Sequence, residues 1–194
     1  REAIDRALIQ AGVDWDDIDA VILGKAPDMF EGVMMPELFL ADSIGAYNKP
    51  LLRVHTAGSV GGSTAIMAAT HITSGQYKCV LTVSFEKQSE SNATWALSPK
   101  YPYTPHINAG AGGYFAPYMR EYIRRSGAPE HIGWQVAVKD RQNANLNPLA
   151  HLQIPGIDLD MVKSTPMLWE PLRYLESCPS SDGACALIIA ATDI

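Results

Sequence analysis

Apolar side chains are arranged along the chain partly at helical spacing and partly in short unbroken runs. Residues 1–12 place alanine, isoleucine and leucine on one face of a helix that Gly12 ends. The next apolar run, 18–24, is bounded by Asp and Gly and is typical of a buried strand. The same rhythm then repeats twice, and it predicts helices over 34–46 and 63–75 and strands over 49–54 and 78–86. This order predicts a layered α/β domain with a largely parallel sheet.

The regular pattern is interrupted after residue 86. Residues 87–110 contain Pro, Ser, Asn and aromatic residues without a clear period, and a loop of that length is usually functional or an insertion. The elements predicted beyond it are helices over 112–127, 129–148 and 158–164, the last capped by Asp158, and a buried strand over 184–191.

Composition narrows the classes of function. Net charge is −6 without a long basic run, so we expect no nucleic-acid partner. No apolar run reaches the roughly 18–20 residues of a membrane span, so we expect no membrane partner. The three widely spaced cysteines form neither a disulfide framework nor a metal site, and a cytoplasmic location is the default expectation. Because both ends of the chain fall inside regular elements, we expect a fragment or a protomer that needs a partner.

The segment "RVHTAGSVGGSTAIMAA" joins the second predicted strand to the third predicted helix and contains the candidate site. It places Ser59 at the carboxyl end of a strand, the edge where open α/β sheets bind ligands. Ser63 is a predicted N-cap, so helix amides and the positive end of the dipole point toward the turn and favour an oxyanion. Gly58, Gly61 and Gly62 are expected to permit positive φ and close approach of a substrate.

The role of Ser59 is open between three interpretations. The pattern Ala57-x-Ser59-x-Gly61 is a weakened form of the nucleophile elbow of α/β-hydrolases, because its first glycine is replaced. A nucleophilic serine needs a base, and His55 is a candidate that also fits a structural role. In a second interpretation the turn is only structural, because its glycines let a helix and a strand approach closely. The remaining histidines, none in a diagnostic context, are His71, His106, His131 and His151.

A third interpretation comes from a family resemblance. Gly62-Ser63-Thr64-Ala65 resembles the start of the buried helix of the thiolase superfamily, in particular of its lipid-transfer, sterol-carrier-type thiolases. These enzymes carry a nucleophilic Cys three residues earlier, where this chain has Ser59. Three further segments resemble, in order, the strand after that helix, the loop domain and the closing Ser-Asp-Gly-Ala strand: 81–91, 110–151 and 177–190.

The resemblance implies a fold and a domain organisation. It implies the amino-terminal half of a thiolase-like α-β-α domain, formed by residues 1–86 and 177–194, with a mainly helical loop-domain insertion over 87–176. The carboxyl-terminal half of a thiolase, with its His motif and second Cys, is expected to be absent from this chain. It also implies a homodimer, for which the strand "CVLTVSFE" is expected to pair across a two-fold axis.

The resemblance also implies a function. Thiolysis needs a thiolate, whereas a serine hydroxyl stays protonated near neutral pH without a strong base. Because the helix amides survive the change, we expect carbon–carbon cleavage of a β-hydroxyacyl-CoA by a retro-aldol reaction, in lipid or steroid side-chain degradation. A coenzyme A thioester is then the substrate, no cofactor is expected, and a small OB-fold/zinc-ribbon protein is an expected partner. The alternatives are an acetyl-CoA acyltransferase and a non-catalytic lipid-transfer or partner subunit.

Several other residues have both a structural and a functional interpretation. Cys185 and Cys79 are expected to be buried, while Cys178 borders a loop. Asp182 either orients the site loop or forms ordinary Asp-Gly turn chemistry. The dense aromatic residues are expected to be mostly core, with one or two lining an acyl or sterol tunnel: Trp95, Tyr101, Tyr103, Tyr114, Phe115, Tyr118 and Tyr122. Three arginines are candidates for coenzyme A phosphates or for a solvated helix face: Arg120, Arg124 and Arg125.

Overall fold

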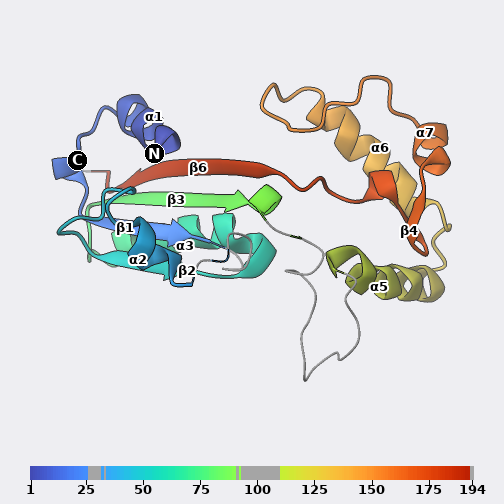
Figure 1. The fold of residues 1–194 in the computed structure, drawn as a ribbon, viewed down its shortest axis with the longest axis horizontal. Coiled ribbons are helices and arrows are strands. Elements are labelled where there is room, and N and C mark those ends of the chain that lie inside the picture. The colour runs from blue at the N-terminus through green and yellow to red at the C-terminus, as the bar shows by residue number, and fades with distance from the viewer. Residues whose placement is uncertain (26–31, 33, 91, 93–109, 193–194) are drawn as a thin grey trace. The chain divides into compact units, whose positions relative to one another are not determined.

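The computed structural model of the chain describes residues 1–25, 32, 34–90, 92 and 110–192. The chain divides into two compact units (Figure 1). The sheet unit consists of Arg1–Ser91 and Asp182–Ile194, and the helical unit consists of Asn92–Ser181. His106 and the aromatic residues Trp95, Tyr101 and Tyr103 lie outside the described residues.

The sheet unit contains a four-stranded mixed sheet with the order β2-β1-β3-β6. Its strands are β1 (Ala20–Gly24), β2 (Leu51–Val54), β3 (Cys79–Lys87) and β6 (Asp182–Ala190). β1 pairs in parallel with both β2 and β3, and β6 pairs with β3 in the antiparallel direction. The carboxyl ends of β1, β2 and β3 therefore lie at one edge of the sheet.

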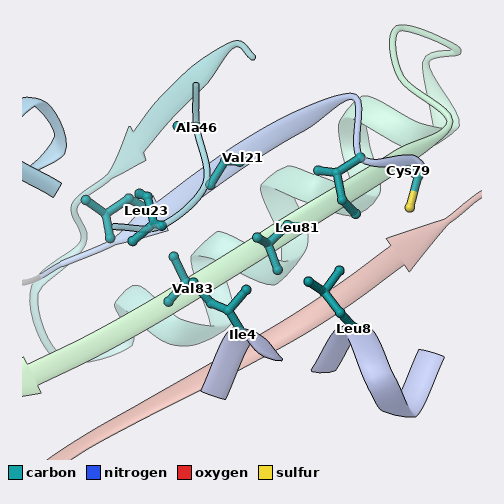
Figure 2. Close-up of a cluster of buried hydrophobic side chains, with 10 residues drawn as sticks. Ile4, Leu8, Val21, Leu23, Ala46, Cys79, Leu81 and Val83 are labelled. Carbon is teal, nitrogen blue, oxygen red and sulfur yellow. The ribbon is translucent and has the colours of Figure 1, made fainter. Parts of the chain in front are cut away.

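Helices cover both faces of this sheet. On one face α1 (Glu2–Ala11) buries Ile4 and Leu8 against β3, as Figure 2 shows, and the segment that follows α2 (Pro36–Leu40) packs on the same face. On the other face α3 (Val60–Thr73) packs through Ala68 against a second apolar cluster. Alternate residues of each strand face one helix layer or the other, so the α/β layered fold is confirmed.

Three expectations about these elements were wrong. β3 lies between β1 and β6, so both its edges are paired and it cannot pair with a second copy across a two-fold axis. β6 lies at the border of the sheet and is mostly exposed instead of buried, because within the described residues a strand pairs with it on one side only. The helix expected over 34–46 shortens to α2, since turns follow it up to Gly45.

The helical unit contains α5 (Gly110–Ser126), α6 (Ile132–Ala144) and α7 (Leu159–Ser164). The predicted cap of α7 is confirmed, because the Asp158 carboxylate accepts a hydrogen bond from the Met161 amide at 2.7 Å. A hairpin of β4 (Met167–Trp169) and β5 (Leu172–Arg173) was not predicted, because its strands are shorter than the apolar pattern resolves. Short 3-10 turns occupy Trp15–Asp17, Ala57–Ser59, Gln88–Glu90 and Tyr174–Glu176.

Within the described part of the chain, no helix has the length and apolar character needed to cross a membrane.

Candidate functional site

The candidate site lies where β2 leads into α3. β2 ends at Val54, a 3-10 turn covers Ala57–Ser59, and α3 starts at Val60 with Ser59 as its N-cap. Residues 55–59 are all exposed, so the turn is open to a ligand on the surface of the sheet unit. Ala57 has φ +48°, in the left-handed region that residues other than glycine avoid. Such strained positions cluster at functional sites.

Thr56 fixes the turn by three hydrogen bonds. Its carbonyl accepts from the Ser59 amide at 3.2 Å and from the Ser59 hydroxyl at 2.9 Å. Its own hydroxyl donates to the Ser63 Oγ at 2.8 Å, one turn into the helix. The hydroxyl proton of Ser59 therefore points at a carbonyl, and a carbonyl does not act as a general base. This geometry does not activate Ser59 as a nucleophile.

The start of α3 offers backbone amides to the exposed turn. An α-helix leaves its first amides without intrahelical acceptors, and the dipole makes this end positive. Around Gly58, Gly61 and Gly62 there is open space, because a Cβ at any of them would meet nothing within 4 Å. A ligand can therefore approach the backbone closely, and the turn can stabilise an anionic oxygen.

Two details of the expected turn differ from the structure. Ser63 is not the N-cap; it is the fourth residue of α3, and the helix begins earlier because the Val60 amide already bonds to the Ala57 carbonyl. The left-handed φ angle belongs to Ala57 and not to Gly58, Gly61 or Gly62. The glycines therefore contribute space and not backbone conformation.

α3 is held closely against the sheet beneath the site. The buried Thr64 hydroxyl donates to the Val60 carbonyl at 2.7 Å. A Cβ at Gly24, the last residue of β1, would lie 2.4 Å from that Thr64 hydroxyl and 2.2 Å from the Ser84 hydroxyl of β3. The absence of a side chain at Gly24 thus lets α3 sit directly on the carboxyl end of β1.

A buried ion pair lies at the same edge and was missed by the sequence analysis. The Lys25 ammonium, 1% exposed, is 2.5 Å from Oε2 of Glu86, which is 19% exposed. The ammonium also lies 5.0 Å from the centre of the Phe85 ring. The sequence does show a lysine and a glutamate at the ends of two apolar strands. The strand register that brings these two residues together could not be predicted from the sequence.

Asp182 orients the loop that follows β3. Its carboxylate accepts from the Ser89 amide at 2.9 Å and from the Ser89 hydroxyl. The hydrogen bond from the Ser89 hydroxyl, followed by that from the amide, lowers the pKa of Asp182. Asp182 therefore tethers the loop that follows β3, and the interpretation as Asp-Gly turn chemistry is wrong because Asp182 and Gly183 are the first two residues of β6.

Among the described residues, no histidine or cysteine side chain forms a hydrogen bond with Ser59. His55 is exposed, and among the described residues its ring has no hydrogen-bond partner. Cys79 is buried as expected, and burial, followed by Asp19 and Asp17, raises the pKa of its thiol. Cys185 is exposed, against expectation, because it lies on β6, and Cys178 is exposed too. The described residues contain no His, Cys, Asp or Glu cluster that could hold a metal ion.

The helical unit carries exposed aromatic rings and engaged arginines. Four aromatic residues on α5 are 45–59% exposed, so the expectation of a packed core is wrong for them: Tyr114, Phe115, Tyr118 and Tyr122. Arg124 donates two hydrogen bonds to Glu121, at 2.6 and 2.7 Å, and Arg125 donates a third. Arg124 and then Arg125 lower the pKa of Glu121. These contacts favour a solvated helix face over phosphate binding.

A cavity of about 570 Å³ lies between α5 and α6 in the helical unit. Glu176 lines this cavity, and burial raises the pKa of its carboxyl group, against smaller opposing effects from Arg173. Arg141 closes one side by donating to the Ser177 carbonyl at 2.5 Å. Two residues that the sequence analysis singled out line this cavity, Tyr122 of the aromatic group and the exposed Cys178.

Curated proteins with similar sequences are named for carrier, transferase and lyase functions. Human sterol carrier protein 2 is 27% identical over 98% of this chain and 36% of its own length. Acetyl-CoA acetyltransferase of Methanothermobacter thermautotrophicus is 26% identical, over 97% and 50%. The 17-hydroxy-3-oxo-4-pregnene-20-carboxyl-CoA lyase of Mycobacterium tuberculosis is 24% identical, over 98% and 51%. The chain thus spans about a third to a half of these relatives. No family model matches it.

Solved structures agree with these relatives. An Ltp2-ChsH2(DUF35) aldolase superposes with a TM-score of 0.74 at 23% identity, over 96% of this chain and 48% of that one. Human mitochondrial 3-ketoacyl-CoA thiolase superposes with a TM-score of 0.65 at 15% identity, over 98% and 58%. Sequence relatives and structural neighbours together confirm the resemblance to the thiolase superfamily, and the chain has the fold of the thiolases.

Proposed function

We propose that this chain forms the thioester-binding half of a thiolase-like enzyme that cleaves a carbon–carbon bond of a β-hydroxyacyl-CoA by a retro-aldol reaction. The observation that carries the proposal is the turn at the start of α3, where glycines leave open space beside the helix amides. The hydroxyl of the neighbouring Ser59 donates its hydrogen bond to the Thr56 carbonyl. Such a turn stabilises negative charge on a thioester oxygen without offering a nucleophile.

The amides suit the charge that this reaction develops. When the bond between Cα and Cβ breaks, its electron pair moves onto the thioester and forms an enolate. The β-hydroxyl group loses its proton and becomes a ketone, and the enolate is then protonated at Cα. Gly61 and Gly62 are the residues whose amides we propose to stabilise the enolate oxygen, since the Val60 amide is already bonded to the Ala57 carbonyl.

Ser59 is the reason to prefer cleavage over thiolysis. By the resemblance it occupies the position of the nucleophilic cysteine, yet among the described residues its hydroxyl donates to the Thr56 carbonyl and forms no hydrogen bond with His55. A hydroxyl without a base does not form an acyl-enzyme at a useful rate. The names of two comparison proteins support the choice: one is a lyase acting on a steroid carboxyl-CoA and the other an aldolase.

The same comparisons suggest the substrate and partners of the whole protein. We propose a steroid or lipid acyl-CoA as substrate, with no resident cofactor. The aldolase structure is named for a complex with a DUF35 protein, which supports a small partner protein of the OB-fold/zinc-ribbon type. A homodimer remains part of the proposal, but β3 is excluded as its pairing strand. We propose a cytoplasmic enzyme.

An acetyl-CoA acyltransferase is the second candidate, and two observations favour it. Archaeal acetyl-CoA acetyltransferases are among the sequence relatives, and mitochondrial thiolase shares the fold. This reaction requires Ser59, or another group, to carry an acyl chain. A lipid-transfer or partner subunit without turnover is the third candidate.

The decisive experiment uses the full-length protein, with and without a co-expressed DUF35 partner. 17-Hydroxy-3-oxo-4-pregnene-20-carboxyl-CoA serves as the probe, and mass spectrometry detects a ketone and a shortened acyl-CoA. We expect Ser59→Ala to keep turnover within about tenfold, since loss of a true nucleophile costs several orders of magnitude. Ser74→Ala, an exposed hydroxyl beyond the end of α3, is the matched control.

Each other outcome supports a different function. An acyl adduct on Ser59, with turnover abolished in Ser59→Ala, supports the acyltransferase and overturns retro-aldol cleavage. Saturable thioester binding without either product supports the non-catalytic subunit. Labelling of Ser59 by a fluorophosphonate supports a serine hydrolase.

A further inference from the structure

The cavity between α5 and α6 has no part in the thioester cradle or in the proposed reaction. Its volume is about 570 Å³, and all the residues that line it belong to the helical unit. Small organic ligands occupy pockets of about 300–1,000 Å³. Two of its lining residues, Tyr122 and Val136, are about half exposed, so the cavity opens to solvent on the described surface of this unit. The cavity is therefore large and open enough for a ligand of its own.

The wall of this cavity is mainly aliphatic. Its aliphatic side chains come from α6 and from the segment that follows β4: Ile132, Val136, Ala137, Ala144, Leu172 and Leu175. The Arg141 guanidinium also lines the cavity, but it donates to the carbonyls of Leu175 and Ser177. Most of the wall thus suits the hydrocarbon part of a ligand, because burial of apolar surface is favourable.

One carboxyl oxygen of Glu176 lacks a hydrogen bond. Oε2 accepts from the Arg173 amide at 2.8 Å, whereas Oε1 is buried and, within the described part of the chain, has no hydrogen-bond partner. Burial raises the pKa of this carboxyl group, against smaller lowering effects of Arg173. An unpaired buried acceptor is costly, so a ligand that donates a hydrogen bond to Oε1 gains free energy.

Gly133 and Met119 lie beside this oxygen. A Cβ at Gly133 would lie 2.1 Å from Oε1 and 2.4 Å from the methyl carbon of Met119. The lack of a side chain at Gly133 therefore makes room for the carboxyl group. The unbranched side chain of Met119 is flexible, and methionine adapts readily to a bound ligand. When the Met119 side chain turns aside, a hydroxyl group in the cavity can reach Oε1.

We propose that this cavity binds an apolar alcohol, a molecule with a hydrocarbon body and one hydroxyl group. The hydrocarbon body packs on the aliphatic wall, and the hydroxyl group donates to Oε1 of Glu176. A ligand with a carboxylate is disfavoured, because two carboxylates at close range cannot both stay ionised at low cost. The inference goes beyond the proposed function and does not depend on thioester cleavage.

The test measures binding of decanol, decyl methyl ether and decanoate to the full-length protein by isothermal titration calorimetry. Decanol and the ether share the hydrocarbon body, but only decanol has a hydrogen-bond donor. We expect decanol to bind at least about tenfold more tightly than the ether, as one hydrogen bond to a carboxyl group provides. Decanoate should bind more weakly than decanol.

Variants test the aliphatic wall and the carboxyl group separately. Ala137→Leu fills part of the cavity from α6 and should weaken binding of decanol and of the ether at least about tenfold. Asn143→Leu, at an exposed position of the same helix, is the matched control and should change both by less than about twofold. Glu176→Met removes the acceptor and should bring the two affinities within about threefold of each other. Thermal unfolding shows that each variant is folded.

Several results would overturn the assignment. The cavity is not a site for an apolar alcohol if the wild type binds neither decanol nor the ether, or binds decanoate more tightly than decanol. Equal affinities of the wild type for decanol and the ether would exclude the hydrogen bond to Glu176. Unchanged decanol binding in folded Ala137→Leu would place the ligand elsewhere. None of these measurements involves the thioester probe, so retro-aldol cleavage stands or fails independently.

Discussion

The sheet unit and the helical unit are held together in different ways. Nearly all fully buried side chains of the described residues belong to the sheet unit, whereas the helical unit buries Ala116, Ile157 and Val162. The helical unit relies instead on charge-assisted bonds, such as those from Arg141 and Arg173 to backbone carbonyls. The difference shows how each unit is held in shape. An apolar core fixes the sheet edge that carries the candidate site, whereas hydrogen bonds from arginines stabilise the unit inserted between β3 and β6.

The largest expected effect is in the sheet core. Leu81 is fully buried in β3, between strands on both sides. Leu81→Ala should lower the free energy of unfolding by about 2–5 kcal/mol, because it removes buried apolar contacts and leaves a cavity. Urea unfolding measures the change. Leu149→Ala, at an 89% exposed position of the helical unit, is the control and should change it by less than about 0.5 kcal/mol. Equal losses would contradict the contrast between the units.

A polar tether should dominate the stability of the helical unit. The Arg141 guanidinium donates to the carbonyls of Ser177 and Leu175. Arg141→Ala should destabilise this unit by about 1.5–3 kcal/mol, the usual range for hydrogen bonds that involve a charged group. Hydrogen exchange resolved by unit reports the effect, with the exposed Lys139→Ala as control. Increased exchange in the sheet unit, with none in the helical unit, would refute the tether.

The close packing of α3 on the end of β1 can be disturbed by one methyl group. Gly24→Ala places a Cβ 2.2 Å from the Ser84 hydroxyl and 2.4 Å from that of Thr64, so the helix must move. We expect a loss of about 1–3 kcal/mol in stability from overpacking. Weaker thioester binding should accompany it. Gly58→Ala is the control for stability, because its Cβ meets nothing within 4 Å. If Gly24→Ala unfolds like the wild type, α3 does not pack closely against Gly24.

The smallest expected effect is a local change with pH. Hydrogen bonds from Ser89 lower the pKa of Asp182, so the charged form is favoured in the folded chain. The contact is therefore complete above the ordinary aspartate pKa of about 3.9 and is lost as pH falls through the lower folded value. The Ser89 amide resonance should stay constant from pH 7 to about 4 and move only below it. In Asp182→Asn this titration should vanish; a midpoint above pH 4 in the parent chain would contradict the assignment.

Local pattern predicted most of the fold. Apolar runs located β1, β2 and β3, and Gly12 and Asp158 marked a helix end and a helix start correctly. Pairing order was not predictable, because β3 and β6 have equally apolar sequences although one is central and the other is at the border. The same limit hid the buried ion pair, since Lys25 and Glu86 meet only through the register of β1 with β3.

The turn at Ser59 shows a finer limit. Small residues and glycines correctly marked an open turn before a helix, but the sequence placed the helix start three residues late. The true start depends on one hydrogen bond from the Val60 amide to the Ala57 carbonyl, and on a left-handed Ala57. A left-handed backbone is unfavourable for alanine, so the local sequence does not predict this conformation at Ala57.

The central claim is that backbone amides at the start of α3 bind the thioester oxygen. Its most direct test is amide NMR of the ¹⁵N-labelled full-length protein, titrated with a non-cleavable thioether analogue and with an acyl-CoA thioester. The account predicts that the thioester shifts the amide resonances of Gly61 and Gly62, and that the thioether, which lacks the carbonyl oxygen, leaves them in place. Saturable thioester binding that leaves these two amide resonances unmoved would contradict it.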